Sequence, residues 1–153
     1  AYRSVGYKYA HKIIPFHNFT QLIEVLRLGS GNNPEMTINL ISKTLSNFIS
    51  SKELTIDSIH VPFEDLLLLG LIKNRFNDGG IAEYLIKKSK ELWNLMISER
   101  DVRVGMLHDG YLKLFQIIGS KINYDLIMVD EAQDSTPATA YVIERQAVQK
   151  VIV

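Results

Sequence analysis

The apolar run Leu126–Val129 is followed at once by two carboxylates, Asp130 and Glu131. Four consecutive apolar residues are typical of a strand buried on both faces, as in a parallel sheet covered by helices. Acidic groups at the carboxyl end of such a strand lie where open α/β sheets bind their ligands. In phosphoryl-transfer enzymes the first acid of such a pair holds Mg²⁺, and a neighbouring acid or amide orients the attacking water. The junction therefore indicates a nucleoside triphosphatase.

The residues after the pair narrow the interpretation. Asp-Glu pairs are common on solvated helix faces, and every strand must end in something polar, so the pair alone leaves a purely structural role open. The full string Asp130-Glu131-Ala132-Gln133-Asp134 resembles the Asp-Glu-x-Gln-Asp form of the Walker B box in UvrD-like superfamily 1 DNA helicases. Few other families combine these five positions.

Two more segments resemble one branch of that superfamily, the F-box DNA helicases. Residues 107–115, Leu-His-Asp-Gly-Tyr-Leu-Lys-Leu-Phe, are similar to the segment that precedes the acid box there. Residues 1–6, Ala-Tyr-Arg-Ser-Val-Gly, are similar to the stretch after that branch's Thr-x-His-Ser single-strand-contact motif. The matches follow the family's order and cover both ends of the chain, whereas residues 30–100 match only loosely.

The resemblance implies that the complete protein is an ATP-dependent 3′–5′ DNA helicase that acts on single-stranded DNA in repair or recombination. Its cofactors would be ATP and Mg²⁺, and its partners would be single-stranded DNA and the remaining helicase domains. It would be intracellular, in the nucleus for a eukaryotic member of the F-box branch and in the cytoplasm otherwise.

Some motifs of the family do not occur in this sequence. There is no Gly-x-x-x-x-Gly-Lys-Ser/Thr phosphate loop, and the chain stops at Val153, before the Gly-Asp-x-x-Gln motif. We therefore expect a fragment that ends just after the Walker B box and is inactive alone. The alternative is a non-enzymatic, truncated helicase-like interaction module.

The resemblance also implies roles for individual residues of the acid box. Asp130 matches the acid that holds Mg²⁺, and Glu131 matches the general base that takes a proton from the attacking water, so both belong to the nucleotide site. Gln133 matches the amide that couples nucleotide state to the DNA-contacting parts. For Asp134 two roles stay open, because a carboxylate just ahead of Thr136 could instead serve the amino end of a helix.

Basic and aromatic residues alternate at the start of the chain. Arg3, Lys8 and Lys12 are interleaved with three tyrosines and a histidine, namely Tyr2, Tyr7, Tyr9 and His11. Such mixtures suit single-stranded DNA, because rings stack on bases while cations meet phosphates. The alternative is an ordinary surface in which the lysines are solvated.

A second candidate for chemistry is the pair His108 and Asp109. Acid-base or metal chemistry is one reading, but no third ligand stands at a recognisable metal spacing. We favour the simpler reading, in which one of the two side chains caps the helix that follows.

Composition sets limits on the remaining function classes. The 153 residues are 46% hydrophobic and 22% charged, which is typical of one folded core, and the net charge is zero, so any DNA binding must come from a local patch. Without cysteines there is neither a disulfide nor a cysteine-ligated metal. The longest apolar stretch, residues 66–72, is far too short to cross a bilayer, so we expect no membrane partner.

The expected fold is α/β: a fragment of a RecA-like P-loop NTPase motor domain that carries a mainly helical insertion. Residues 1–104 would form the insertion (1B-like), and residues 105–153 part of the RecA-like subdomain (1A) with the Walker B strand. Apolar periodicity predicts helices over residues 2–12, 19–28, 34–49, 63–76, 81–97 and 107–118. A strand at 124–129, a helix from Pro137 to about Ala147 and a strand at 151–153 would make a βαβ unit.

Overall fold

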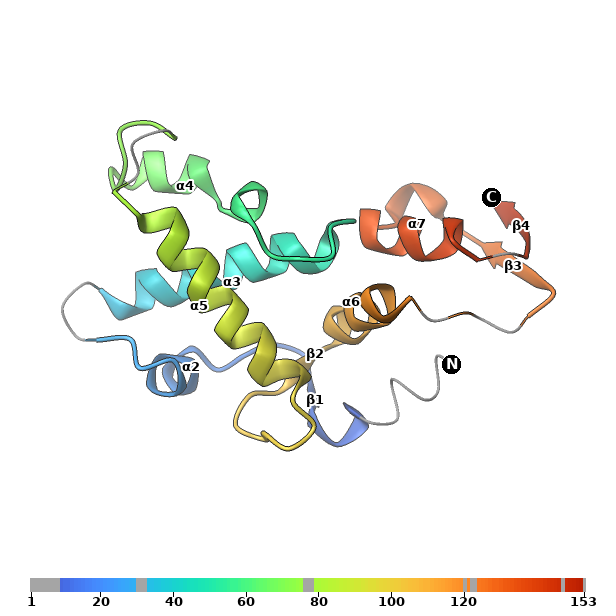
Figure 1. Cartoon of the computed structure of the whole chain (residues 1–153), viewed down its shortest axis with the longest axis horizontal. Coiled ribbons are helices and arrows are strands. Elements are labelled where there is room, and N and C mark those ends of the chain that lie inside the picture. Colours follow the sequence, from blue (N-terminus) through green and yellow to red (C-terminus); the bar gives the residue numbers. More distant parts are fainter. Residues whose placement is uncertain are drawn as a thin grey trace.

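The computed structural model describes residues 9–29, 33–75, 79–119, 121, 124–146 and 148–152. This part of the chain contains six α-helices, α2 to α7, and two separate pairs of short parallel strands (Figure 1). The expected mixed α/β class is therefore confirmed. The assignment to the RecA-like P-loop fold stays a prediction.

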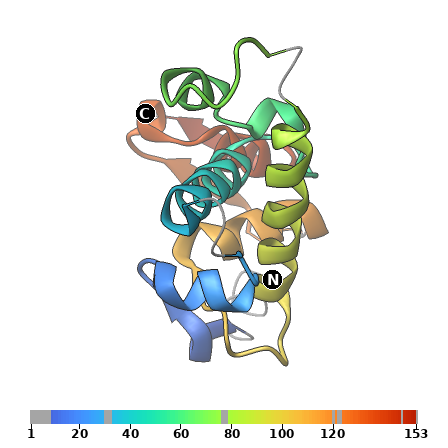
Figure 2. The same ribbon diagram turned by 90° about the vertical axis from the view of Figure 1, so that its left-hand side faces the viewer.

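Two long helices, α3 (Pro34–Ser50) and α5 (Ile81–Ile97), pack against each other and form the centre of the core. Both have the bounds that their apolar periodicity predicts, to within a residue. The Asn33 side chain caps α3 by accepting a hydrogen bond from the Met36 N–H at 3.2 Å. One stripe of each helix is buried in the shared core, comprising Ile38, Ile41, Leu45 and Phe48 of α3 and Leu85, Leu92 and Met96 of α5. In both views α3 lies between α4 (Phe63–Leu68) and α2 (Phe19–Val25) (Figures 1 and 2).

Helix α4 (Phe63–Leu68) is much shorter than the helix predicted over residues 63–76. Gly70 ends it in the left-handed conformation, at φ 68°, and the Leu71 N–H donates back to the Leu66 carbonyl at 3.0 Å. Leu66 is buried, but Leu68 is 86% exposed. The helix is thus shorter than predicted, because the glycine stops it after less than two turns.

The described residues near the amino end form a short 3-10 helix, η1 (Ala10–Lys12), and a two-residue strand, β1 (Ile13–Ile14). Residues 10–12 of the predicted helix 2–12 thus form a 3-10 turn and not an α-helix, and residues 1–8 lie outside the described part. Strand β1 pairs in parallel with β2 (Met106–Leu107), a pairing that the sequence did not predict. At Gly105 a Cβ atom would come within 2.9 Å of three atoms of Ile14, so only glycine fits this approach.

The β1–β2 pairing joins residues on both sides of the predicted boundary between 104 and 105. The division into an insertion and a motor segment stays a prediction, but the two segments are in direct contact. His17, just before helix α2 (Phe19–Val25), adds to this contact, because its Nε2 lies 2.9 Å from the Gly105 carbonyl oxygen.

Helix α6 (His108–Ile118) starts without a side-chain cap. Its N-cap residue is Leu107, so the prediction that His108 or Asp109 caps the helix was wrong. Both side chains are exposed. Gly119 ends the helix at φ 68°.

The carboxyl part contains β3 (Leu126–Val129), helix α7 (Pro137–Glu144) and β4 (Gln149–Ile152). Strands β3 and β4 pair in parallel, so the predicted βαβ order is confirmed. The predicted cap is also correct, since Thr136 Oγ1 accepts from the Thr139 N–H at 3.2 Å, although α7 ends three residues earlier than expected.

The expected burial of β3 on both faces is wrong for this structure. Met128 is 72% exposed, and Leu126 is exposed as well. Among the described elements β3 packs mainly against β4, which pairs with one edge of the strand and covers neither face.

Candidate functional site

Residues 130–134, here called the acid loop, leave the carboxyl end of β3 by a sharp turn. Glu131 adopts the left-handed conformation at φ 54°, ψ 43°, and the 3-10 helix η3 (Ala132–Asp134) follows. A left-handed residue other than glycine costs on the order of 1–3 kcal/mol, and such strain is concentrated at functional sites. Two backbone bonds hold the turn, from the Asp134 N–H to the Glu131 carbonyl at 2.9 Å and from the Ser135 N–H to the Ala132 carbonyl at 3.1 Å.

Hydrogen bonds, one of them from the backbone, link the three residues to which the resemblance assigns roles. The Glu131 N–H donates to Asp130 Oδ1 at 3.0 Å, and Gln133 Nε2 donates to Glu131 Oε2 at 2.7 Å. All three residues are exposed. In the part of the chain that the structure describes, Asp130 Oδ2 and Glu131 Oε1 have no hydrogen-bond partner, so one oxygen of each carboxylate is available to a ligand.

The donor chemistry of the acid loop fits Mg²⁺ that binds together with a nucleotide. Mg²⁺ prefers hard oxygen ligands and is usually held by one or two carboxylates, with water and substrate phosphates completing its octahedron. Among the described residues, no group of three or more His, Cys, Asp or Glu side chains could hold a metal ion by itself. Asp130 can therefore contribute one ligand to a shared site.

Asp134 lies in η3 and is exposed. It does not cap α7, because the Thr136 hydroxyl occupies that position. Of the two roles left open for Asp134, the helix cap is therefore excluded.

The candidate DNA contacts divide into two groups. Arg3 and Lys8 lie outside the described residues. Lys12 is only 6% exposed, and its Nζ donates to three backbone carbonyls near the end of α5: Leu95 at 3.3 Å, Ser98 at 2.9 Å and Asp101 at 2.6 Å. Burial lowers the pKa of this ammonium, and the nearby Asp101 carboxylate partly offsets the effect. Lys12 thus ties η1 to the end of α5. Its ammonium is engaged there and is not available to contact DNA.

A buried polar cluster surrounds Lys113, and the sequence did not predict it. Lys113 is fully buried, and its Nζ donates to the Ser51 carbonyl at 2.9 Å and the Glu53 carbonyl at 2.5 Å. The same ammonium lies 4.2 Å from the centre of the Phe48 ring. Lysine is rarely buried in folded proteins, and nothing in the residues next to Lys113 indicates that it would be.

His60 completes this cluster from the 3-10 helix η2 (Ser58–His60). Its Nδ1 accepts from the Asp57 N–H at 3.0 Å, and its Nε2 lies 3.1 Å from Ser51 Oγ. Burial lowers the pKa of Lys113 to about 8, and burial also lowers the pKa of His60. At neutral pH the cluster therefore holds a charged lysine beside an uncharged imidazole.

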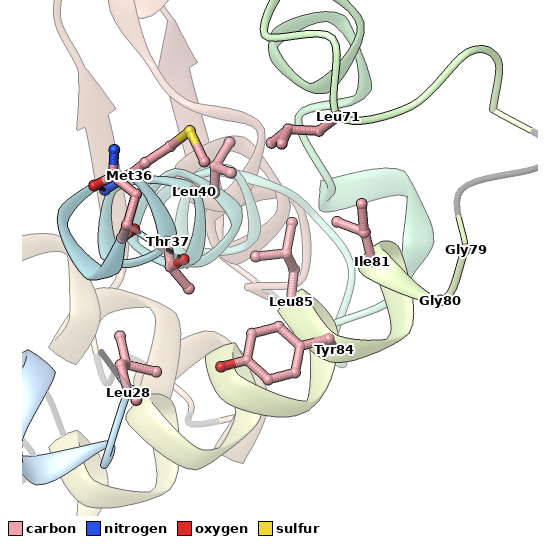
Figure 3. A pocket seen from close by; sticks show the side chains of 12 residues that line it. Leu28, Met36, Thr37, Leu40, Leu71, Gly79, Gly80, Ile81, Tyr84 and Leu85 are labelled. Carbon is pink, nitrogen blue, oxygen red and sulfur yellow. Dashed lines mark hydrogen bonds between the residues drawn. The ribbon is translucent and has the colours of Figure 1, made fainter. Parts of the chain in front are cut away.

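The larger cavities lie elsewhere in the molecule. One of about 730 Å³ and one of about 860 Å³ adjoin the first half of α3. The smaller of the two is lined mainly by aliphatic side chains such as Leu40, Leu71 and Leu85 (Figure 3), and its described lining contains no carboxylate, histidine or lysine. It lies at the end of the molecule opposite β3 (Figure 1), so it offers the acid loop no additional group.

Within the ranges that the structure covers, no helix is both long enough and apolar enough to span a membrane.

Comparison with known proteins identifies relatives among the helicases. The chain is 32% identical over 122 residues to the F-box DNA helicase 1 of Gallus gallus. This match covers 74% of the chain and 11% of the relative. It is 29% identical over 132 residues to the F-box DNA helicase protein 1 of Schizosaccharomyces pombe, covering 80% of this chain and 14% of the relative. The chain is related to DNA helicases. It spans about a ninth to a seventh of the length of these curated relatives.

No family model matches this helicase-related chain. No solved structure matches it. The two helicase relatives agree with the resemblance carried by the acid loop and by residues 107–115, and they come from the same F-box branch. The finer assignment to UvrD-like superfamily 1 remains a matter of motif resemblance.

Proposed function

We propose that this chain is part of an ATP-dependent DNA helicase of UvrD-like superfamily 1, and that the acid loop is its Walker B box. The observation that carries the proposal is the linked set of Asp130, Glu131 and Gln133 at the carboxyl end of a strand in a parallel pair. The names of the two relatives support the helicase class. Translocation from 3′ to 5′, a role in repair or recombination, and an intracellular location, nuclear for a eukaryotic member, are further parts of the proposal.

Two carboxylates of the acid loop, Asp130 and Glu131, would have different roles. Asp130 would hold Mg²⁺ through Oδ2, since Oδ1 already accepts the Glu131 N–H. When bound with ATP, Mg²⁺ neutralises the charge that develops on the phosphate oxygens. Glu131 would accept a proton from the attacking water at Oε1, while Gln133 holds Oε2 and so fixes the orientation of the carboxylate. Because Gln133 touches the base directly, a movement of the amide would change the position of Glu131.

The 153-residue chain by itself is expected not to hydrolyse ATP. Its sequence has no phosphate loop, whose backbone N–H groups and lysine supply most of the contacts to the phosphates. Purified chain with ATP and Mg²⁺ should release phosphate no faster than its Glu131→Gln variant. Turnover clearly above that control would show that the chain carries a complete site.

Arg3 and Lys8 are expected to contribute to single-strand binding in the complete protein. Each phosphate contact on a single strand adds about 0.7 to the slope of log affinity against log salt concentration. Replacing both residues with alanine should therefore reduce the magnitude of the slope by about 1.4, as measured by fluorescence anisotropy with a labelled oligonucleotide.

The matched control for this pair is Lys87→Ala with Lys90→Ala, which removes two exposed cations from α5. This variant should keep the native slope. If the Arg3 and Lys8 variant also keeps it, the two residues belong to ordinary solvated surface.

A further inference from the structure

Residues 107–115 are part of the family resemblance, but the proposed function leaves them without a role. The structure places them at the start of α6, and Lys113 is the member of this segment whose charge is buried. Transfer of an ammonium from water into a protein interior is strongly unfavourable, so a buried lysine is a poor way to gain stability. An apolar residue of similar length would fill the same space at a lower cost.

The buried ammonium joins α6 to a segment more than fifty residues earlier in the chain. Besides the two carbonyls of Ser51 and Glu53, Lys113 Nζ lies 3.5 Å from Ser51 Oγ. One turn further along α6, Gln116 Nε2 donates to the carbonyl of Lys52 at 2.7 Å. Three successive carbonyls, 51 to 53, are thereby held by two side chains of α6. These contacts fix both the position and the rotation of α6 on the connection that follows α3.

Helix α6 in turn supports the helix that follows the acid loop. It packs against α7, and α3 contacts both helices. Helix α7 begins at Pro137, directly after its cap Thr136, and Ser135 is bonded back to Ala132 of the acid loop. A displacement of α6 would therefore be passed to α7 and to the loop that carries Asp130 and Glu131.

We propose that Lys113 is a positioning residue, whose buried ammonium fixes α6 on the 51–53 connection and thereby holds α7 and the acid loop in their working positions. The catalytic part of this inference rests on the proposed function of the acid loop. The structural part, that the clamp orders residues 130–140, stands independently.

The chain contains a matched control in Lys12. It too is a buried lysine whose ammonium donates to backbone carbonyls, three in its case, but it holds the end of α5 and not α6. Lys113→Met and Lys12→Met each remove one buried ammonium and its set of carbonyl contacts. If the loss of a buried ammonium only weakens the fold, the two variants should have the same effects.

The first measurement is steady-state ATP turnover by the complete protein at saturating single-stranded DNA. Lys113→Met should lower kcat by about ten- to a hundred-fold, because a displacement of about 1 Å at a catalytic group costs up to about a hundred-fold. KM for ATP should change less than kcat. Gln116→Met should also lower kcat. It is the milder change because, among the described residues, Gln116 Oε1 is buried and has no hydrogen-bond partner. Lys12→Met should leave kcat within about two-fold of the native value, because the Lys12 ammonium is bonded at the end of α5 and not to the 51–53 connection.

The second measurement is hydrogen exchange in the complete protein, followed in peptides that cover residues 130–140. Exchange at Ser135, Thr139 and Ala140, whose N–H groups are bonded within this segment, should be faster in Lys113→Met and Gln116→Met and native in Lys12→Met. Native exchange in both α6 variants, or equal acceleration in Lys12→Met, would overturn the clamp. Faster exchange with native kcat would overturn its catalytic role. If Glu131→Gln turns over ATP as fast as the native protein, the proposed function fails, and exchange alone decides whether the clamp exists.

Discussion

Glu131→Gln in the complete protein is expected to lower ATP turnover by about 10²- to 10⁴-fold, the usual effect of losing a positioned general base. Nucleotide affinity should stay close to native. Glutamine keeps the size of the side chain, and its amide oxygen can still accept the hydrogen bond from Gln133 Nε2. The amide cannot accept a proton from water, so the rate of the chemical step should fall while nucleotide affinity is kept.

Asp130→Asn is the informative comparison, because the neighbouring carboxylate has a different task. Removing the charge that faces the metal should weaken Mg²⁺-dependent nucleotide binding as well as turnover. Phosphate release and nucleotide titrations with and without Mg²⁺ separate the two variants. Near-normal turnover in Glu131→Gln would refute its role as the base, and equal loss of turnover and affinity would indicate a structural role.

Phe48→Ala is expected to lower the free energy of unfolding of this chain by about 3–5 kcal/mol, the usual loss for truncating a buried phenylalanine. Phe48 is 1% exposed and lies at the centre of the core. Its ring meets His60 edge-on at 5.4 Å and Trp93 at 5.5 Å between ring centres, and it also carries the Lys113 ammonium on its face. The substitution therefore leaves a cavity and removes one neighbour of a buried charge.

Phe16→Ala is the matched control for this experiment. Phe16 is 77% exposed, so its loss should change the free energy of unfolding by less than about 0.5 kcal/mol. Urea denaturation of the two variants beside the native chain gives both values. A loss below about 1 kcal/mol in Phe48→Ala would mean that the core described around α3 and α5 is not the stabilising one.

The elements that the sequence predicts well are those with local causes. Helices α3 and α5 follow from apolar residues at helical spacing, and the start of α7 follows from Thr136 and Pro137. The acid loop follows from an apolar run that ends in carboxylates. Each of these signals lies within a few residues of the structure that it specifies.

The features that escaped prediction depend on residues distant in sequence. Strand β1 exists because residues 106–107 pair with it, and Gly105 permits the approach. Lys12 and Lys113 are buried because carbonyls from other segments receive their ammonium groups, whereas a lone lysine in a sequence is read as solvated. The exposure of β3 likewise depends on which elements cover the sheet, and no pattern within four residues contains that information.

Only part of the candidate site can be compared with the prediction. The roles of Asp130, Glu131 and Gln133 stay predictions, whereas Lys12 belongs to the scaffold, because its ammonium is buried among backbone carbonyls. Gln133 holding Glu131 was not anticipated in that form, since the resemblance assigned the amide to coupling and not to orientation of the base. A side chain two residues from its partner can make this contact because Glu131 is left-handed and turns the chain back on itself.

The most direct test of the proposed function is ATP turnover by the complete protein and its Glu131→Gln variant, measured with and without single-stranded DNA. We predict Mg²⁺-dependent turnover that single-stranded DNA stimulates and that falls by about 10²-fold or more in the variant. Turnover that is absent under both conditions, or that Glu131→Gln leaves intact, would contradict the assignment of the acid loop as the catalytic part of a DNA-dependent ATPase.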